Sequence, residues 1–132
     1  METHIQKFLL AAESKALATI SPQGIMNVIP VSTLKIRDNK IILMNYFMGK
    51  TQENITQNNY IALVAWSDMF GYQIKGPVDY ITTGELYEEM KNWVSVTFPE
   101  RNLYGLLAID PKEIYDIAPD KKTKEYTNEH IS

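Results

Sequence analysis

Residues 40–51 read Lys-Ile-Ile-Leu-Met-Asn-Tyr-Phe-Met-Gly-Lys-Thr, and this stretch decides how the chain is interpreted. The apolar run at residues 40–44 predicts a strand, and the polar segment that follows predicts a helix. Between them, Gly49 provides a turn, Lys50 supplies a positive charge, and Thr51 can cap a helix whose first backbone N–H groups have no partner inside it. This arrangement predicts a clamp for an anion.

Two other interpretations of Gly49, Lys50 and Thr51 have to be weighed. The tripeptide also ends the nucleotide-binding pattern G-x-x-x-x-G-K-[ST], but the first glycine of that pattern would fall on Met44, and no strand-helix-strand alternation surrounds it. The plainer alternative is a solvated Lys50 beside a Thr51 that is an ordinary helix cap. On the tripeptide alone, the phosphate clamp and this plainer alternative both stay open.

Length and composition describe one ordinary domain. The chain has 132 residues, of which 45% are hydrophobic and 22% are charged, as in soluble globular proteins. A net charge of −3 with scattered lysines provides no basic field for a nucleic acid backbone. We therefore expect no nucleic acid partner.

The residue inventory excludes several kinds of catalytic centre. The chain contains no cysteine, and its two histidines, His4 and His130, lie near its ends. These facts argue against disulfides, thiol nucleophiles, Ser-His-Asp triads and a metal site. The start of the chain has neither a signal-peptide pattern nor a long apolar run, so we expect a cytoplasmic protein without a membrane segment.

Periodicity and turn residues predict the order of helices and strands. Helices are expected at residues 3–14, 51–58 and 85–98, and strands at 15–20, 25–36, 40–45, 60–66, 71–83, 103–109 and 113–117. The segment 60–66 is almost wholly apolar, which predicts a strand buried on both faces. The strand at 71–83 is long enough to bend around a barrel, with Gly76-Pro77 as a bulge or edge device.

This order contains no long βαβ crossover, so it predicts a mostly antiparallel barrel with peripheral helices. We expect a single domain over residues 1–118, followed by a polar tail over residues 119–132. From residue 120 onwards the tail is charged and is expected to be frayed.

Three segments resemble the flavin-binding split-barrel family, which includes the pyridoxamine 5′-phosphate oxidases and the small FMN-binding proteins. They are Ile-Leu-Met-Asn-Tyr-Phe-Met-Gly-Lys-Thr-Gln-Glu-Asn at 42–54, Asn-Asn-Tyr-Ile-Ala-Leu-Val-Ala-Trp at 58–66, and Gly-Tyr-Gln-Ile-Lys-Gly-Pro-Val at 71–78. The closing segment at 109–117 matches as well, so the similarity runs from about Phe8 to Ala118. The resemblance implies a mainly β fold, an antiparallel, Greek-key-like split barrel with peripheral helices.

The resemblance also implies residues that bind FMN. In the family, the residue types at Lys50 and Thr51 contact the phosphate, those at Leu43 and Met44 line the flavin, and the type at Gln73 reaches the ring in the oxidases. The backbone of the strand that matches residues 28–33 follows the isoalloxazine ring. A cross-strand contact for Gln73 and a plain strand end at Asn45 remain alternatives. The implied cofactor-binding residues are Val28, Ile29, Pro30, Val31, Ser32, Thr33, Leu43, Met44, Asn45, Gly49, Lys50, Thr51 and Gln73.

The chain departs from the oxidase pattern at several positions. Gly49 stands where the oxidases carry a second phosphate-binding arginine, and the strand at Val28 lacks their other arginine. Ser32 or Thr33 can replace the missing arginine as a hydroxyl donor, and the sequence does not choose between them. The C-terminal Trp and Arg segment of the oxidases is absent, which argues against pyridoxamine phosphate oxidation.

The resemblance therefore predicts an FMN-binding homodimer with the flavin at the subunit interface. Its expected activity is that of a flavin-dependent oxidoreductase of unknown substrate, which takes electrons or a hydride from a reduced nicotinamide donor. No catalytic residue is identified from the sequence. The alternatives are a flavin electron carrier without an enzymatic substrate, and a structural or regulatory barrel that binds another cofactor such as haem or a deazaflavin.

Overall fold

The computed structural model describes residues 1–119 and 124–127. Within these residues it contains three helices, α1 (Thr3–Ala11), α2 (Lys50–Gln57) and α3 (Glu85–Thr97). The strands are β1 (Ser14–Ile20), β2 (Met26–Pro30), β3 (Leu34–Arg37), β4 (Lys40–Asn45), β5 (Tyr60–Ser67), β6 (Phe70–Ile81), β7 (Gly105–Ile109), β8 (Glu113–Asp116) and β9 (Lys124–Thr127). The mostly antiparallel arrangement with peripheral helices that the sequence predicts is confirmed.

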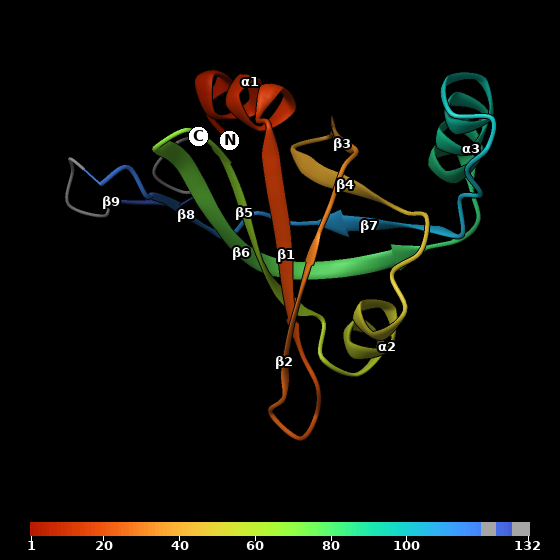
Figure 1. Ribbon diagram of the computed structural model, residues 1–132, viewed down its shortest axis with the longest axis horizontal. Coiled ribbons are helices and arrows are strands. Elements are labelled where there is room, and N and C mark those ends of the chain that lie inside the picture. Colours follow the sequence, from red (N-terminus) through yellow and green to blue (C-terminus); the bar gives the residue numbers. More distant parts are fainter. Residues whose placement is uncertain (120–123, 128–132) are drawn as a thin grey trace.

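The strands form one antiparallel sheet in the order β2-β1-β5-β6-β7-β4-β3, and β8 and β9 extend it from β6. Figure 1 shows α1, α2 and α3 at three separate places around this sheet. Short turns join β1 to β2, β3 to β4 and β5 to β6. Asp38 and Asn39 both have positive φ between β3 and β4, as a two-residue hairpin turn requires.

Strand β6 connects the two halves of the sheet because it bends. Its residues 70–77 pair with β5, and its residues 78–81 pair with β7. At the bend, a Cβ atom on Gly76 would lie 1.8 Å from the backbone oxygen of Asp110. Glycine therefore lets the connection between β7 and β8 approach β6 closely, and the long bending strand predicted from the sequence is confirmed.

Two hydrophobic cores lie on opposite faces of β4 and β7. Leu43 belongs to the larger core, which α1 and α2 cover, whereas Met44 belongs to a smaller core with Met90 and Val94 of α3. Every residue of β7 is buried. Strands buried on both faces read as continuous apolar runs, and here those strands are β4 and β7.

The two-sided burial predicted for residues 60–66 is wrong. In β5, Ile61, Leu63 and Ala65 are buried in the larger core, while Tyr60 and Trp66 are exposed. Ile5 and Leu9 of α1 and Ile55 of α2 belong to that same core, so these helices cover the other side of β5. The apolar sequence of β5 thus has a second, uncovered side.

We call this uncovered side the open face. It consists of the outward side chains of β1, β2, β5, β6 and β8, which the strand register places in common rows: Ala16, Ala18, Ile20, Met26, Val28, Pro30, Tyr60, Ala62, Val64, Trp66, Gln73, Lys75, Glu113 and Tyr115. Met26 and Val28 are 79% and 65% exposed. A solvated face of an antiparallel sheet is usually polar, so an apolar face of this size indicates a binding surface.

The single long strand predicted at residues 25–36 is also wrong. The chain leaves the sheet at residues 31–33, so that β2 pairs with β1 and β3 pairs with β4. Pro30, which has no N–H group to donate to a ladder, ends β2. The two strands therefore belong to opposite edges of the sheet.

The prediction of a frayed tail from residue 120 onwards is wrong for one segment. Residues 124–127 form β9, which pairs with β8. The remaining residues of the predicted tail, 120–123 and 128–132, lie outside the described part of the chain.

Candidate functional site

Asn45 organises the turn that leads from β4 to α2. Its side chain is 1% exposed, and its Nδ2 donates to Oε1 of Gln52 at 3.0 Å and to the hydroxyl of Tyr80 at 2.7 Å. Its Oδ1 accepts the backbone N–H of Met48 at 2.9 Å. The Asn45 amide is therefore committed to holding the turn in place.

Gly49 is the residue at which the chain turns into α2. Its φ of 52° and ψ of −112° are open only to glycine at little cost, and no atom lies within 4 Å of where a Cβ would stand. The predicted glycine turn is confirmed. Gly49, and not Thr51, is the N-cap residue of α2, and the helix has no side-chain cap.

Thr51 is completely buried, so the predicted capping role of its side chain is wrong. Its Oγ1 accepts a hydrogen bond of 2.9 Å from Nδ2 of Asn27 on β2. The backbone N–H of Thr51 donates to the carbonyl of Met48 at 3.1 Å, so both the hydroxyl and the amide of Thr51 have partners within the chain.

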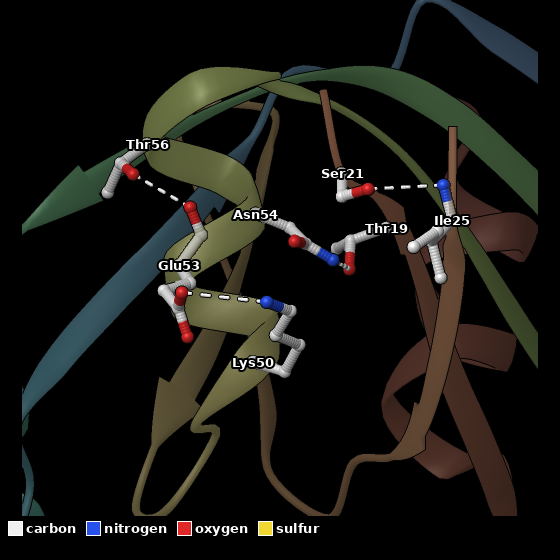
Figure 2. Close-up of polar contacts among 7 residues, drawn as sticks. All are labelled: Thr19, Ser21, Ile25, Lys50, Glu53, Asn54 and Thr56. Atoms are coloured by element: carbon white, nitrogen blue, oxygen red, sulfur yellow. Dashed lines mark hydrogen bonds and ion pairs between the residues drawn. The ribbon is translucent and has the colours of Figure 1, made fainter. Parts of the chain in front are cut away.

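Lys50 is the exposed cation at the same helix start. Its side chain is 60% exposed, and its Nζ lies 3.5 Å from Oε1 of Glu53, one turn further along α2 (Figure 2). An ion pair at this exposure contributes little free energy, so the Lys50 ammonium remains able to bind an anion. Glu53 weakens the positive potential at this end of the helix.

Two buried pairs fix α2 against the β1–β2 hairpin. One is the Asn27–Thr51 hydrogen bond, and the other is a 3.0 Å bond from Nδ2 of Asn54 to Oγ1 of Thr19 (Figure 2). Sequence reasoning missed Thr19, Asn27 and Asn54. The signal was present at Asn27, because asparagine is unfavourable in a strand and here stands between Met26 and Val28.

The strand predicted to follow the flavin ring lies at the edge of the open face. A surface pocket of about 450 Å³ is lined by Val28, Ile29, Pro30 and Val31, together with Glu13, the first three residues of β1 and Trp66. This volume is in the range of small-molecule sites. Ser32 is exposed, whereas the hydroxyl of Thr33 lies 3.0 Å from that of Tyr46 in the turn before α2. Thr33 therefore connects the segment after β2 to the turn before α2.

The other predicted contacts lie elsewhere. Leu43 and Met44 are buried in the two separate cores, so a cofactor would meet their backbone and not their side chains. Gln73 is half-buried on the open face, opposite Val64 and Tyr115, and is not part of the α2 start. Within a single chain, the hydrogen bonds of Asn27 and Thr33 connect β2 and the segment after it to α2 and the turn before it. Gln73 lies apart from these predicted residues.

A polar cluster on the open face was not predicted. The hydroxyls of Tyr60 and Tyr115 donate to the two carboxylate oxygens of Glu113 at 2.8 Å and 2.7 Å. These bonds, the one from Tyr115 first, lower the pKa of Glu113, and Lys75 lowers it further. The bond to Glu113 raises the pKa of Tyr60. The cluster spans β5 and β8, so only the fold could reveal it.

Metal-ligating groups and membrane-spanning helices were sought in the part of the chain that the structure describes. Residues 1–119 and 124–127 contain no group of three or more side chains suited to hold a metal ion. None of the described helices is long and apolar enough to cross a membrane.

The fold and the glycine-lysine turn define a class of protein, the antiparallel split β-barrels related to pyridoxamine phosphate oxidase. Comparison with known sequences agrees, because the profile of the pyridoxamine 5′-phosphate oxidase family matches residues 1–118. The chain belongs to the pyridoxamine 5′-phosphate oxidase family.

Individual relatives differ in what they bind. An uncharacterised protein of Methanocaldococcus jannaschii is 30% identical over 106 residues, which cover 76% of this chain and 70% of the relative. An FMN-binding protein from Syntrophomonas wolfei has a similar structure, with a TM-score of 0.76, 18% identity, and coverage of 89% of this chain and 86% of that one. A haem-binding protein from Mycobacterium smegmatis has a TM-score of 0.72 and 10% identity, covering 99% of this chain and 60% of that one. The shared fold therefore serves more than one cofactor.

Proposed function

We propose that the protein binds FMN non-covalently, with the phosphate at Gly49 and Lys50 and the flavin ring along the strand at residues 28–33. The observation that carries this proposal is the glycine turn that presents the exposed Lys50 ammonium at the start of α2. Backbone N–H groups at a helix start and one lysine are a suitable donor set for a single terminal phosphate. Family membership and the FMN-binding structure from Syntrophomonas wolfei support the choice of cofactor.

The residues of the chain would divide the work of binding. Lys50 neutralises phosphate charge, and the backbone of Val28, Ile29 and Pro30 offers donors and acceptors to the polar edge of the ring. Asn45 and Gly49 hold the turn, while the Asn27–Thr51 bond keeps the helix start in register with β2. Bound FMN would supply hydride or electron transfer, and a reduced nicotinamide is the proposed donor.

The proposed assembly is a homodimer, in which a second copy covers much of the open face. Trp66, Val28 and Met26 are exposed there, and apolar patches of this kind mark interaction surfaces. The pocket along residues 28–31 also opens on this face, so a partner copy would close it around the flavin. The cytoplasmic location remains a prediction.

Titration with two ligands tests the phosphate assignment. FMN and riboflavin differ by the phosphate, so Lys50→Ala should weaken FMN binding by about 1.5–3 kcal/mol, as for a lost hydrogen bond to a charged group, and leave riboflavin binding unchanged. Lys91→Ala, on the exposed side of α3, is the matched control. Equal FMN affinity in the wild type and in Lys50→Ala would contradict the assignment of Lys50 to the phosphate.

Sedimentation velocity tests the dimer. Val64→Glu places a carboxylate in the middle of the open face and should yield monomers, whereas Val96→Glu, at an exposed site on α3, should not. A wild-type protein that is monomeric at all concentrations would contradict the proposed assembly.

Two alternative functions differ in what they do with reducing equivalents. A flavin electron carrier would be reduced reversibly and show no turnover with small substrates, whereas an oxidoreductase would consume reduced nicotinamide continuously once an acceptor is present. The other alternative is a barrel that binds haem in place of flavin, and it is supported by the haem-binding relative. If the protein bound haem and did not bind FMN, the proposal of an FMN-binding protein would be wrong.

A further inference from the structure

We propose that the open face carries a second small-molecule site, a trough that binds an amphipathic anion with a short apolar body and one carboxylate. The trough lies between β2, β1, β5 and β6 and encloses about 250 Å³. It does not include Lys50 or any other part of α2.

The strand register explains why the sheet is hollow at this place. Val28 lies opposite Ala18, Ala18 opposite Ala62, and Ala62 opposite Lys75, so that four neighbouring strands contribute one row of side chains. The two central members of the row are alanines. The walls are the larger side chains of the next row, among them Ile20, Met26 and Tyr60. Small side chains in the middle of a row of larger ones leave a depression lined by methyl and methylene groups.

Lys75 gives the trough its charge. It is the single charged residue in the lining, and the salt bridges found among the described residues do not include it. Its Nζ lies 5.5 Å from the centre of the Tyr115 ring. Glu113 stands opposite Lys75 on β8 and attracts it electrostatically, but Glu113 is not part of the lining, and its two carboxylate oxygens accept hydrogen bonds from Tyr60 and Tyr115. The Lys75 ammonium is therefore the group that a ligand would meet at the end of an apolar trough.

This combination selects a ligand class. The apolar lining favours a hydrocarbon body, because the transfer of methylene groups from water to an apolar surface is favourable. The ammonium favours an anionic end group through a charge-assisted hydrogen bond. A volume just below the usual range for ligand pockets suits a medium alkyl chain or one aromatic ring, and a cationic amphiphile of the same length would be repelled.

The trough is compatible with the proposed dimer. A second copy that covers the open face would remove Lys75 from water, and an ammonium in an apolar enclosure is unfavourable unless it is hydrogen-bonded to a counter-charge. A carboxylate beside Lys75 would neutralise it. The trough itself belongs to one chain, so the inference does not require FMN.

Isothermal titration of the full-length protein with sodium decanoate, below its micelle-forming concentration, tests the site. We expect one decanoate per chain and no binding of decyltrimethylammonium. Lys75→Met keeps most of the apolar stem of the side chain, removes its charge, and should weaken binding about tenfold or more, whereas Lys91→Met should leave it unchanged. Ala62→Leu should abolish binding, because the new side chain fills the trough.

Several outcomes would overturn the inference. They are an unchanged affinity in Lys75→Met, equal binding of decyltrimethylammonium, or complete loss of decanoate binding after saturation with FMN, which would make the trough part of the flavin site. If the wild-type protein bound decanoate but did not bind FMN, the proposed function would be wrong and the inference of this site would be supported.

Discussion

Asn45 offers a quantitative test of what holds the turn between β4 and α2. Replacement by alanine removes two donors and one acceptor that together engage Gln52, Tyr80 and the backbone of Met48. A hydrogen bond contributes about 1 kcal/mol on average, so three of them in a fully buried position correspond to a loss of about 3 kcal/mol in the free energy of unfolding. For a domain of this size the melting temperature should fall by roughly 10 °C.

Urea denaturation followed by tryptophan fluorescence measures this loss. We expect Asn45→Ala to lower the denaturation midpoint without a change in the slope m, since the folded state keeps its extent. Tyr80→Phe removes one of the three bonds and should cost about 1 kcal/mol, which gives a measurable intermediate case. Asn92→Ala, on the exposed side of α3, should have almost no effect. A loss below about 1 kcal/mol in Asn45→Ala would refute the idea that this side chain holds the turn.

Three further predictions concern the backbone and the open face. Gly49→Ala should destabilise the protein by about 1–3 kcal/mol in the same assay, because its φ of 52° and ψ of −112° strain any side chain although space is free. Gly76→Ala should cost roughly 3 kcal/mol or more, because the new Cβ would collide with the backbone oxygen of Asp110; a wild-type midpoint would contradict the bend. The lowered pKa of Glu113 contributes stability above the ordinary pKa of a glutamate, and this contribution disappears as the pH falls through the lowered value. Tyr60→Phe should therefore raise the pKa of Glu113, measured by carbon NMR of its carboxyl group, and an unchanged pKa would exclude this bond as a cause.

Local sequence signals succeeded where one short segment determines the outcome. The Asp38-Asn39 turn, the glycine turn before α2 and the long strand with its Gly76 bend were all predictable, because turn dihedrals and periodicity depend on neighbouring residues. The family resemblance added the fold. The assignment of FMN contacts to individual residues remains a prediction.

Sequence reasoning failed where distant segments decide the outcome. The apolar run at residues 60–66 is consistent with burial on either one face or two, and only the placement of α1 and α2 leaves the Tyr60 and Trp66 side uncovered. Thr51 looks like a cap in its local sequence, yet Asn27 on another strand makes it a buried acceptor.

The sequence by itself determined most of the order of helices and strands, although it joined β2 to β3 and missed β9, and it determined the positive-φ turn at Gly49 and the family of the protein. These features follow from residue chemistry within a few positions along the chain. Only the tertiary structure decided that Lys75 stands at the end of a row with Ala18 and Ala62. It also decided that Glu113 accepts hydrogen bonds from the hydroxyl groups of two tyrosines. The physical reason is that strand register is a relation between segments far apart in sequence, and it is fixed by the packing of the whole sheet.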